Sequence, residues 1–161
     1  EVWASPLERA QQTATPLALA KGLDIVTDDR IIEADNVFEG QRVSIGDGVL
    51  KQPKAWKHLY DPFKPSWGEP YKQIAARMRD AVFSARESAR GHEILLVSHQ
   101  LPVWTSRLDF EDRRLWHDPR HRQCNLASLT SLAFDGDDLK AIVYTEPAGD
   151  LVAKAHKGAG A

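Results

Sequence analysis

Apolar residues along the chain fall into two patterns, short continuous runs and stripes with helical spacing. The runs at residues 2–4, 23–27 and 94–97 predict strands, and the last is apolar throughout, as expected of a strand buried on both faces of a parallel sheet. The stripes predict amphipathic helices over residues 5–21 and 70–90, and a third helix is expected from Pro102. The inward positions are Leu7, Ala10, Ala14, Leu17 and Ala18 in the first helix and Ile74, Met78, Ala81, Val82, Ala85 and Ala89 in the second. Strands that alternate with helices predict an α/β fold, a three-layer α/β/α domain with a mostly parallel central sheet.

The ends of the first helix carry local signals. Ser5 is a good N-cap, Pro6 suits the first helical position, and Glu8 completes an S-x-x-E capping box. Gly22 marks the end of the helix, and Pro16 is expected to kink or split it. The N–H groups that follow Ser5 should then form an electropositive helix end suited to an anion.

Two further segments complete the domain. Residues 127–134 and 139–145 flank the turn sequence DGDD and predict a β-hairpin. Small residues and lysines predominate after residue 146, so we expect a disordered tail over residues 147–161 and a domain over residues 1–146. Residues 41–69, rich in Gly, Pro and Trp, form an insertion that is either a lid over a site or a plain surface loop.

Composition narrows the class of protein. The 161 residues, 42% of them apolar, suffice for one domain with a core. A net charge of −2 argues against a nucleic-acid binder that works by bulk charge. No apolar run approaches the roughly 20 residues of a membrane helix, and the one cysteine fits a reducing compartment, so a cytoplasmic location is expected.

Polar groups from two strand ends are expected at the same edge of the sheet. Ser5 follows the first strand and His99 follows the strand at 94–97, and ligands of such sheets bind outside the carboxyl ends of the strands. Arg9 lies one helical turn after Ser5, where a guanidinium can make paired hydrogen bonds to phosphate or carboxylate. The alternatives are a capped helix with a surface arginine and a histidine that only caps the next helix.

Three segments together resemble a known family. Residues 5–14, SPLERAQQTA, look like the second signature of the histidine phosphatase (phosphoglycerate mutase-like) superfamily, and residues 97–102, VSHQLP, resemble the motif of its second active-site histidine. The acidic segment IEADNVFEG at residues 32–40 lies between them, in the family order. The resemblance runs from Val2 to about Tyr144 and implies a phosphoglycerate mutase-like fold.

One family signature does not occur in the sequence. Members begin with a strand that ends in Arg-His-Gly, whose histidine accepts the phosphoryl group, and the 161 residues contain no Arg-His-Gly. We therefore expect the first strand and helix, with the nucleophile, to lie in a segment before Glu1, and residues 1–146 to be an N-terminally incomplete domain.

The resemblance also implies roles for four residues. Ser5 and Arg9 would bind the phosphoryl group together with His99, whose cationic form should be within reach at mildly acidic pH. Glu33 resembles the proton donor to the leaving group, and it needs a raised pKa to hold that proton. Glu39 is the rival for this role, because the family's acidic segment also ends in Glu-Gly.

Charged residues elsewhere offer weaker candidates. Arg42, Glu69, Arg114 and His117 are the candidates for the mouth of the site, where they would select an acidic substrate, although the sequence favours solvated surface groups for most of these charged residues. Glu69 would either orient an active-site arginine or act as a helix-entry carboxylate. His117 and His121 have i, i+4 spacing, but Pro119 between them disfavours a metal pair, and we expect neither a metal nor a cofactor.

These features together predict a metal-independent phosphomonoester hydrolase that works through a phosphohistidine. Its partner would be a small-molecule phosphomonoester, with no nucleic acid and no membrane, and the sequence leaves a homodimer open. A phosphoglycerate-type mutase is less favoured, because residues 36–38 do not resemble the Tyr-Gly-containing run that such mutases carry after the equivalent glutamate. The third alternative is a non-catalytic relative that binds a phospholigand.

Overall fold

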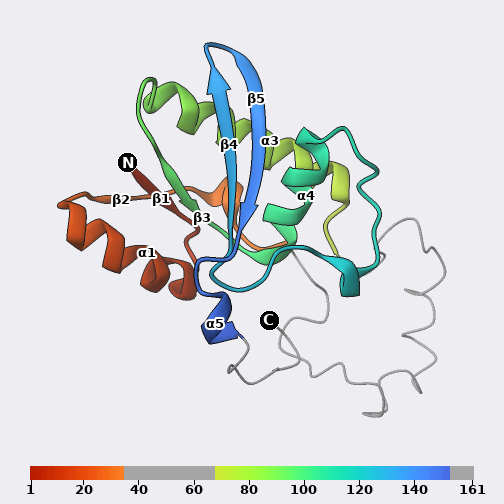
Figure 1. Cartoon of the computed structure of the whole chain (residues 1–161), viewed down its shortest axis with the longest axis horizontal. Coiled ribbons are helices and arrows are strands. Elements are labelled where there is room, and N and C mark those ends of the chain that lie inside the picture. The colour runs from red at the N-terminus through yellow and green to blue at the C-terminus, as the bar shows by residue number, and fades with distance from the viewer. Residues whose placement is uncertain (35–67, 153–161) are drawn as a thin grey trace.

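A three-stranded parallel sheet in the order β2-β1-β3 lies at the centre of the computed structural model, which describes residues 1–34 and 68–152 (Figure 1). The strands are β1 (Val2–Ala4), β2 (Ile25–Thr27) and β3 (Leu95–Val97). Their register pairs Ala4 with both Thr27 and Val97, so all three strands end at one level. The residues that follow them therefore meet at one edge of the sheet.

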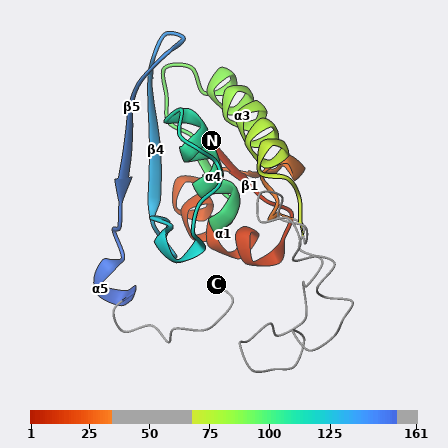
Figure 2. The ribbon, with the colours of Figure 1, turned by 90° about the vertical axis from the view of Figure 1, so that its right-hand side faces the viewer.

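Helices cover both faces of this sheet. On one face, Ala14 of α1 (Glu8–Lys21) packs with Val2 and Ala4. On the other face, Ile74 and Met78 of α3 (Tyr71–Ser88) form a core that includes Leu96. Figures 1 and 2 show α1 and α3 on opposite sides of the strands, so the predicted three-layer α/β arrangement is confirmed.

The first helix differs from its prediction in three details. The helix begins at Glu8 with Leu7 as its N-cap residue, so the predicted capping box does not form; the Ser5 hydroxyl accepts from the Leu7 N–H at 3.3 Å and faces His99. The helix runs unbroken through Pro16 and ends at Gly22, which takes the left-handed conformation (φ 61°). Leu17, expected on the inward stripe, is 38% exposed, whereas the smaller Ala10, Ala14 and Ala18 are buried against the sheet.

The segment around β3 also differs from its prediction. β3 was expected to be buried on both faces, yet all of its residues are half-buried, since among the described residues β3 pairs only with β1. The next helix, α4 (Gln100–Phe110), begins two residues before Pro102. Pro102 fits inside its first turn, where no backbone N–H is needed for a helical bond.

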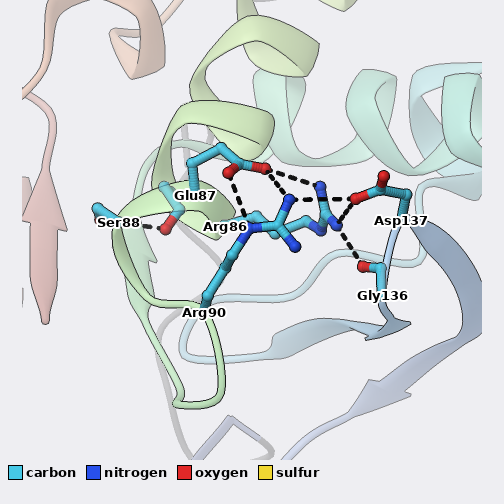
Figure 3. A network of polar contacts seen from close by, with 7 residues as sticks. Arg86, Glu87, Ser88, Arg90, Gly136 and Asp137 are labelled. Atoms are coloured by element: carbon cyan, nitrogen blue, oxygen red, sulfur yellow. Dashed lines mark hydrogen bonds and ion pairs between the residues drawn. The ribbon is translucent and has the colours of Figure 1, made fainter.

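The predicted hairpin is confirmed. Strands β4 (Leu129–Asp135) and β5 (Asp138–Thr145) pair antiparallel, and Gly136 supplies the positive φ (55°) of the turn. Its tip is attached to the C-terminal end of α3, where Arg86 contacts the Gly136 carbonyl and the Asp137 carboxylate (Figure 3). The guanidinium of Arg86 also lies 5.1 Å from the centre of the Phe134 ring.

Part of the expected tail is ordered. Residues Gly149–Val152 form a short helix, α5, whose turns are closed by N–H groups of Gly149 and Leu151 that donate to Glu146 and Ala148 carbonyls. The prediction of disorder from residue 147 is therefore wrong for this helix, while residues 153–161 lie outside the described part. The predictions for Arg42, Glu39 and most of the insertion at 41–69 also fall outside it. None of the described helices combines the length and apolar character that a bilayer crossing requires.

Candidate active site

His99 is the centre of a cluster that joins the ends of two strands. Its Nε2 lies 2.8 Å from Ser5 Oγ, and its Nδ1 accepts a hydrogen bond from Arg9 Nε at 3.2 Å. Glu33 Oε2 lies 3.9 Å from the same Nδ1. Three residues, up to 94 positions away in the sequence, are thus brought around the imidazole ring of His99.

Backbone and side-chain contacts fix this ring at the edge of the sheet. Ser5 is completely buried, and its N–H donates to the Val97 carbonyl at 2.9 Å. Ser98 Oγ donates to the Ile31 carbonyl at 2.7 Å, which ties the end of β3 to the 3₁₀ turn η1 (Asp29–Ile31) just before Glu33. His99 is the N-cap residue of α4, but its side chain makes no capping hydrogen bond. The alternative in which His99 only caps the helix is therefore excluded.

The hydrogen bonds define the tautomer of His99. Because Arg9 Nε donates to Nδ1, the proton of the neutral ring is on Nε2, which donates to Ser5 Oγ. Burial, together with the positive charges of Arg9 and Arg77, lowers the pKa of His99 to about 4. This low pKa runs against the expectation of a cationic His99 at mildly acidic pH, because the histidine is buried beside two arginines.

Glu33 has the electrostatic environment of a carboxyl group that can hold a proton. It is half-buried, and burial raises its pKa above the usual range. The opposing influences are a hydrogen bond from the Ala34 N–H, at 2.9 Å, and then the charges of Arg9, Arg122 and Arg77. A carboxyl group with a raised pKa can donate a proton and can later accept one.

Arg77 holds the backbone that leads to Glu33. Its Nε and Nη2 donate to the two oxygens of Glu69, each at 2.8 Å, and its Nη1 donates to the carbonyls of Arg30 at 2.6 Å and Ile32 at 2.8 Å. Both side chains are more than four-fifths buried. Glu69 thus orients an arginine, as one of its two interpretations predicted, and that arginine clamps the turn before Glu33.

A second arginine reaches the site from the loop before β4. Arg122 Nε donates to His117 Nε2 at 2.8 Å, and the charge of Arg122 acts on Glu33. The same charge acts on Cys124, a buried thiol whose pKa burial raises. His117 therefore reaches the site through Arg122, whereas the exposed Arg114 makes no hydrogen bond or ion pair in the described part of the chain.

Sequence reasoning missed both Arg77 and Arg122. Arg77 lies on α3, eight residues after Glu69, so the prediction that Glu69 orients an arginine could have been extended to Arg77. Arg122 lies in a loop without periodicity and had no comparable signal. Across residues 1–34 and 68–152, no cluster of His, Cys, Asp and Glu has the arrangement of a metal site.

Comparison with known proteins places the chain in a family. The family model described as histidine phosphatase superfamily, branch 1, matches residues 1–146. An uncharacterised protein of Mycobacterium tuberculosis, Rv0525, is 57% identical over 147 residues, which cover 91% of this chain and 73% of the relative. Phosphoserine phosphatase 1 of Hydrogenobacter thermophilus is 28% identical over 106 residues, covering 63% of this chain and 49% of that enzyme.

Solved structures share the fold at low sequence identity. Bacillus stearothermophilus YhfR superimposes with a TM-score of 0.66 at 23% identity, covering 86% of this chain and 70% of that structure. The mycobacterial glucosyl-3-phosphoglycerate phosphatase Rv2419c superimposes with a TM-score of 0.54 at 22% identity, covering 71% of this chain and 58% of that structure. At these identities the likeness concerns the fold.

Proposed function

The chain belongs to the histidine phosphatase superfamily, and from that premise we propose that its protein hydrolyses small phosphomonoesters without a metal ion. The observation that carries the proposal is the His99 ring, which has Ser5 at Nε2 and both Arg9 and Glu33 at Nδ1. An acid with a raised pKa next to fixed nitrogen donors is what phosphoryl transfer to a histidine needs when no metal neutralises the charge.

The first half-reaction forms a phosphohistidine. The nucleophilic histidine, which we place in an Arg-His-Gly segment outside these 161 residues, attacks phosphorus, so an N–P bond forms as the ester P–O bond breaks. Protonated Glu33 gives its proton to the departing alcohol oxygen. In the second half-reaction the Glu33 carboxylate takes a proton from water, the new P–O bond forms, the N–P bond breaks, and inorganic phosphate leaves.

Arg9 and His99 stabilise the transferring group. In the described residues, Arg9 donates only through Nε, so both of its Nη groups are available to the equatorial phosphoryl oxygens. A bound phosphate dianion raises the pKa of His99 from about 4, because it opposes the positive charges of Arg9 and Arg77. His99 then donates to the phosphoryl oxygen while the negative charge is greatest.

Activity of the protein made from its complete coding sequence tests this proposal. We expect hydrolysis of p-nitrophenyl phosphate in the presence of EDTA and an acid-labile phosphoenzyme in rapid-quench experiments. Glu33→Gln and His99→Ala should each reduce kcat by about 100- to 10,000-fold. Glu87→Gln, which changes an exposed glutamate of α3 in the same way, is the matched control and should keep full activity.

The same assay separates the alternatives. Transfer of the phosphoryl group to a second phosphoglycerate when 2,3-bisphosphoglycerate is supplied, without release of inorganic phosphate, would identify a mutase. Phosphate binding without turnover or phosphoenzyme would identify a non-catalytic relative, and either result would overturn the hydrolase proposal.

A further inference from the structure

Arg122 has an anchored guanidinium whose outer edge has no partner in the described part of the chain. Its Nε donates to His117 Nε2, and the side chain is half-buried. Its Nη groups make no hydrogen bond or ion pair with any of the described residues. Arg77 differs in this respect, because all three of its guanidinium nitrogens have partners.

The anchor is a histidine fixed in one tautomer. His117 Nδ1 donates to the Leu115 carbonyl at 2.8 Å, which leaves Nε2 as the acceptor for Arg122. The His117 ring also contacts the rings of Tyr71, at 5.4 Å, and Trp104, at 5.9 Å. Burial, with a smaller contribution from Arg122, lowers the pKa of His117 against the opposing influences of the Leu115 carbonyl and Asp118. The ring therefore stays neutral and keeps its acceptor.

The loop that carries Arg122 lies beside the residues of the His99 cluster. The His117 ring contacts Tyr71, two residues after Glu69. Gln100, the residue after His99, donates to the Cys124 carbonyl at 2.8 Å. Arg122 is one of three arginines whose charge acts on Glu33, whereas the charges that act on His99 are those of Arg9 and Arg77. Arg9 contacts the His99 ring and so belongs to the phosphoryl end. In the proposed reaction Glu33 faces the oxygen of the leaving alcohol. Because Arg9 faces the phosphoryl group, a second arginine of the same cluster is available to the alcohol part of the substrate.

We propose that Arg122, positioned by His117, binds an anionic group in the alcohol part of the substrate, so that the preferred substrates are phosphomonoesters with a carboxylate or a second phosphate. This inference rests on the proposed hydrolase function. An arginine held through Nε presents its two Nη groups as a fork that matches the two oxygens of a carboxylate or phosphate. Arg120, two residues earlier, has no such role, since it is 85% exposed and pairs with Asp118.

Two matched substrates test the inference in the complete protein. 3-Phosphoglycerate and glycerol 3-phosphate have similar size and the same ester linkage, but only the first has a carboxylate on the alcohol part. We expect wild-type kcat/KM to favour 3-phosphoglycerate. Arg122→Met should reduce kcat/KM for 3-phosphoglycerate by about 10- to 100-fold, as expected for loss of a charge-assisted hydrogen-bond pair. For glycerol 3-phosphate the change should stay within about threefold.

Two further variants separate recognition from structural damage. His117→Phe keeps a ring between Tyr71 and Trp104 but removes the acceptor for Arg122 Nε. If His117 only positions Arg122, the His117→Phe substitution should raise KM for 3-phosphoglycerate and leave kcat nearly unchanged. Arg120→Met removes a neighbouring exposed arginine and should change neither substrate's kinetics.

The outcomes distinguish this inference from the function on which it rests. Suppose that the wild type cleaves p-nitrophenyl phosphate, but Arg122→Met lowers kcat/KM equally for both matched substrates or for neither. Arg122 then does not bind the alcohol part of the substrate, and the inference is wrong. If the wild type cleaves none of the three esters, the hydrolase function itself is wrong. A loss of kcat/KM in Arg122→Met that is confined to 3-phosphoglycerate supports both the inference and the hydrolase function.

Discussion

A cluster of arginines and carboxylates lies at each end of α3, and the two clusters differ in how many of their arginine nitrogens have partners. At the C-terminal end, Arg86 and Arg90 each pair with both Glu87 and the hairpin-tip residue Asp137, so every charge has an opposite partner (Figure 3). At the N-terminal end, Arg77 is fully paired. Beyond it, Arg9 and Arg122 each donate through Nε to a neutral histidine, and their Nη groups have no partner among the described residues.

This difference separates a structural cluster from a ligand site. Mutual pairing at the hairpin end leaves nothing for a ligand to neutralise, and solvent screens the exposed charges there. At the other end, the arginines shift the pKa of His99 downward and partly offset the burial that raises the pKa of Glu33. An excess of fixed positive charge around a buried imidazole is unfavourable until an anion arrives, and this is the electrostatic preorganisation that binding and catalysis use.

Removing the clamp at the N-terminal end should have the largest effect on stability. Arg77→Met breaks a buried ion pair and leaves both the Glu69 carboxylate and two backbone carbonyls without their donor. We expect the free energy of unfolding to fall by about 3 kcal/mol. Chemical denaturation of the complete protein measures this change, and activity should fall with it because the turn before Glu33 loses its support.

A double variant checks the physical reason. If the loss comes mainly from the uncompensated Glu69 charge, Arg77→Met combined with Glu69→Gln should recover part of the stability. A single variant as stable as the wild type would show that the clamp does not hold this end of α3.

The sequence pattern predicted the layers and the strand ends because both follow from local periodicity. Residues 2–4 and the apolar run before His99 form neighbouring parallel strands, and the register of these strands is what brings Ser5 and His99 to one edge. Glu33 and Arg9 were located by their motifs, and the structure places both next to His99. Their chemical roles stay predictions.

What the sequence could not predict depends on contacts between distant residues. The capping box was locally reasonable, but the Ser5 hydroxyl faces His99, 94 positions away. The lowered pKa of His99 likewise results from burial and from arginines on α1 and α3, and no local pattern reports either. Arg122 depends on the orientation of a loop histidine between two aromatic rings, a tertiary feature without a sequence period.

The pH dependence of stability should reveal the charged environment of His99. Its pKa is about 4 in the folded protein and 6.5 for the ordinary side chain, so between these values the unfolded state binds a proton that the folded state does not. Stability therefore falls as the pH decreases from 6.5 to 4, by about 2 kcal/mol from this residue. Denaturation at several pH values compares the wild type with His99→Gln, which removes the titrating group and keeps a polar side chain.

Glu33 contributes with the opposite sign, because its raised pKa lets the folded state take up a proton before the unfolded state does. The contribution of His99 is therefore the difference between the wild type and His99→Gln in the pH dependence of the free energy of unfolding. Equal slopes from pH 6.5 to pH 4 would show that His99 is not held neutral. Saturating inorganic phosphate should flatten the wild-type slope, since a bound anion raises the pKa of His99.

The smallest effect is expected at the hairpin end of α3. Arg90 is half-exposed, and its partners Glu87 and Asp137 are more exposed still, so solvent replaces most of what these pairs provide. Arg90→Met should change the melting temperature by no more than about 1 °C and leave kcat and KM unaltered. It is the matched control for Arg77→Met, with the same substitution near the other end of the same helix. A large loss of stability in Arg90→Met would mean that the hairpin depends on its ion pairs, and the contrast between a paired structural cluster and an open ligand site would then not explain how this protein uses its arginines.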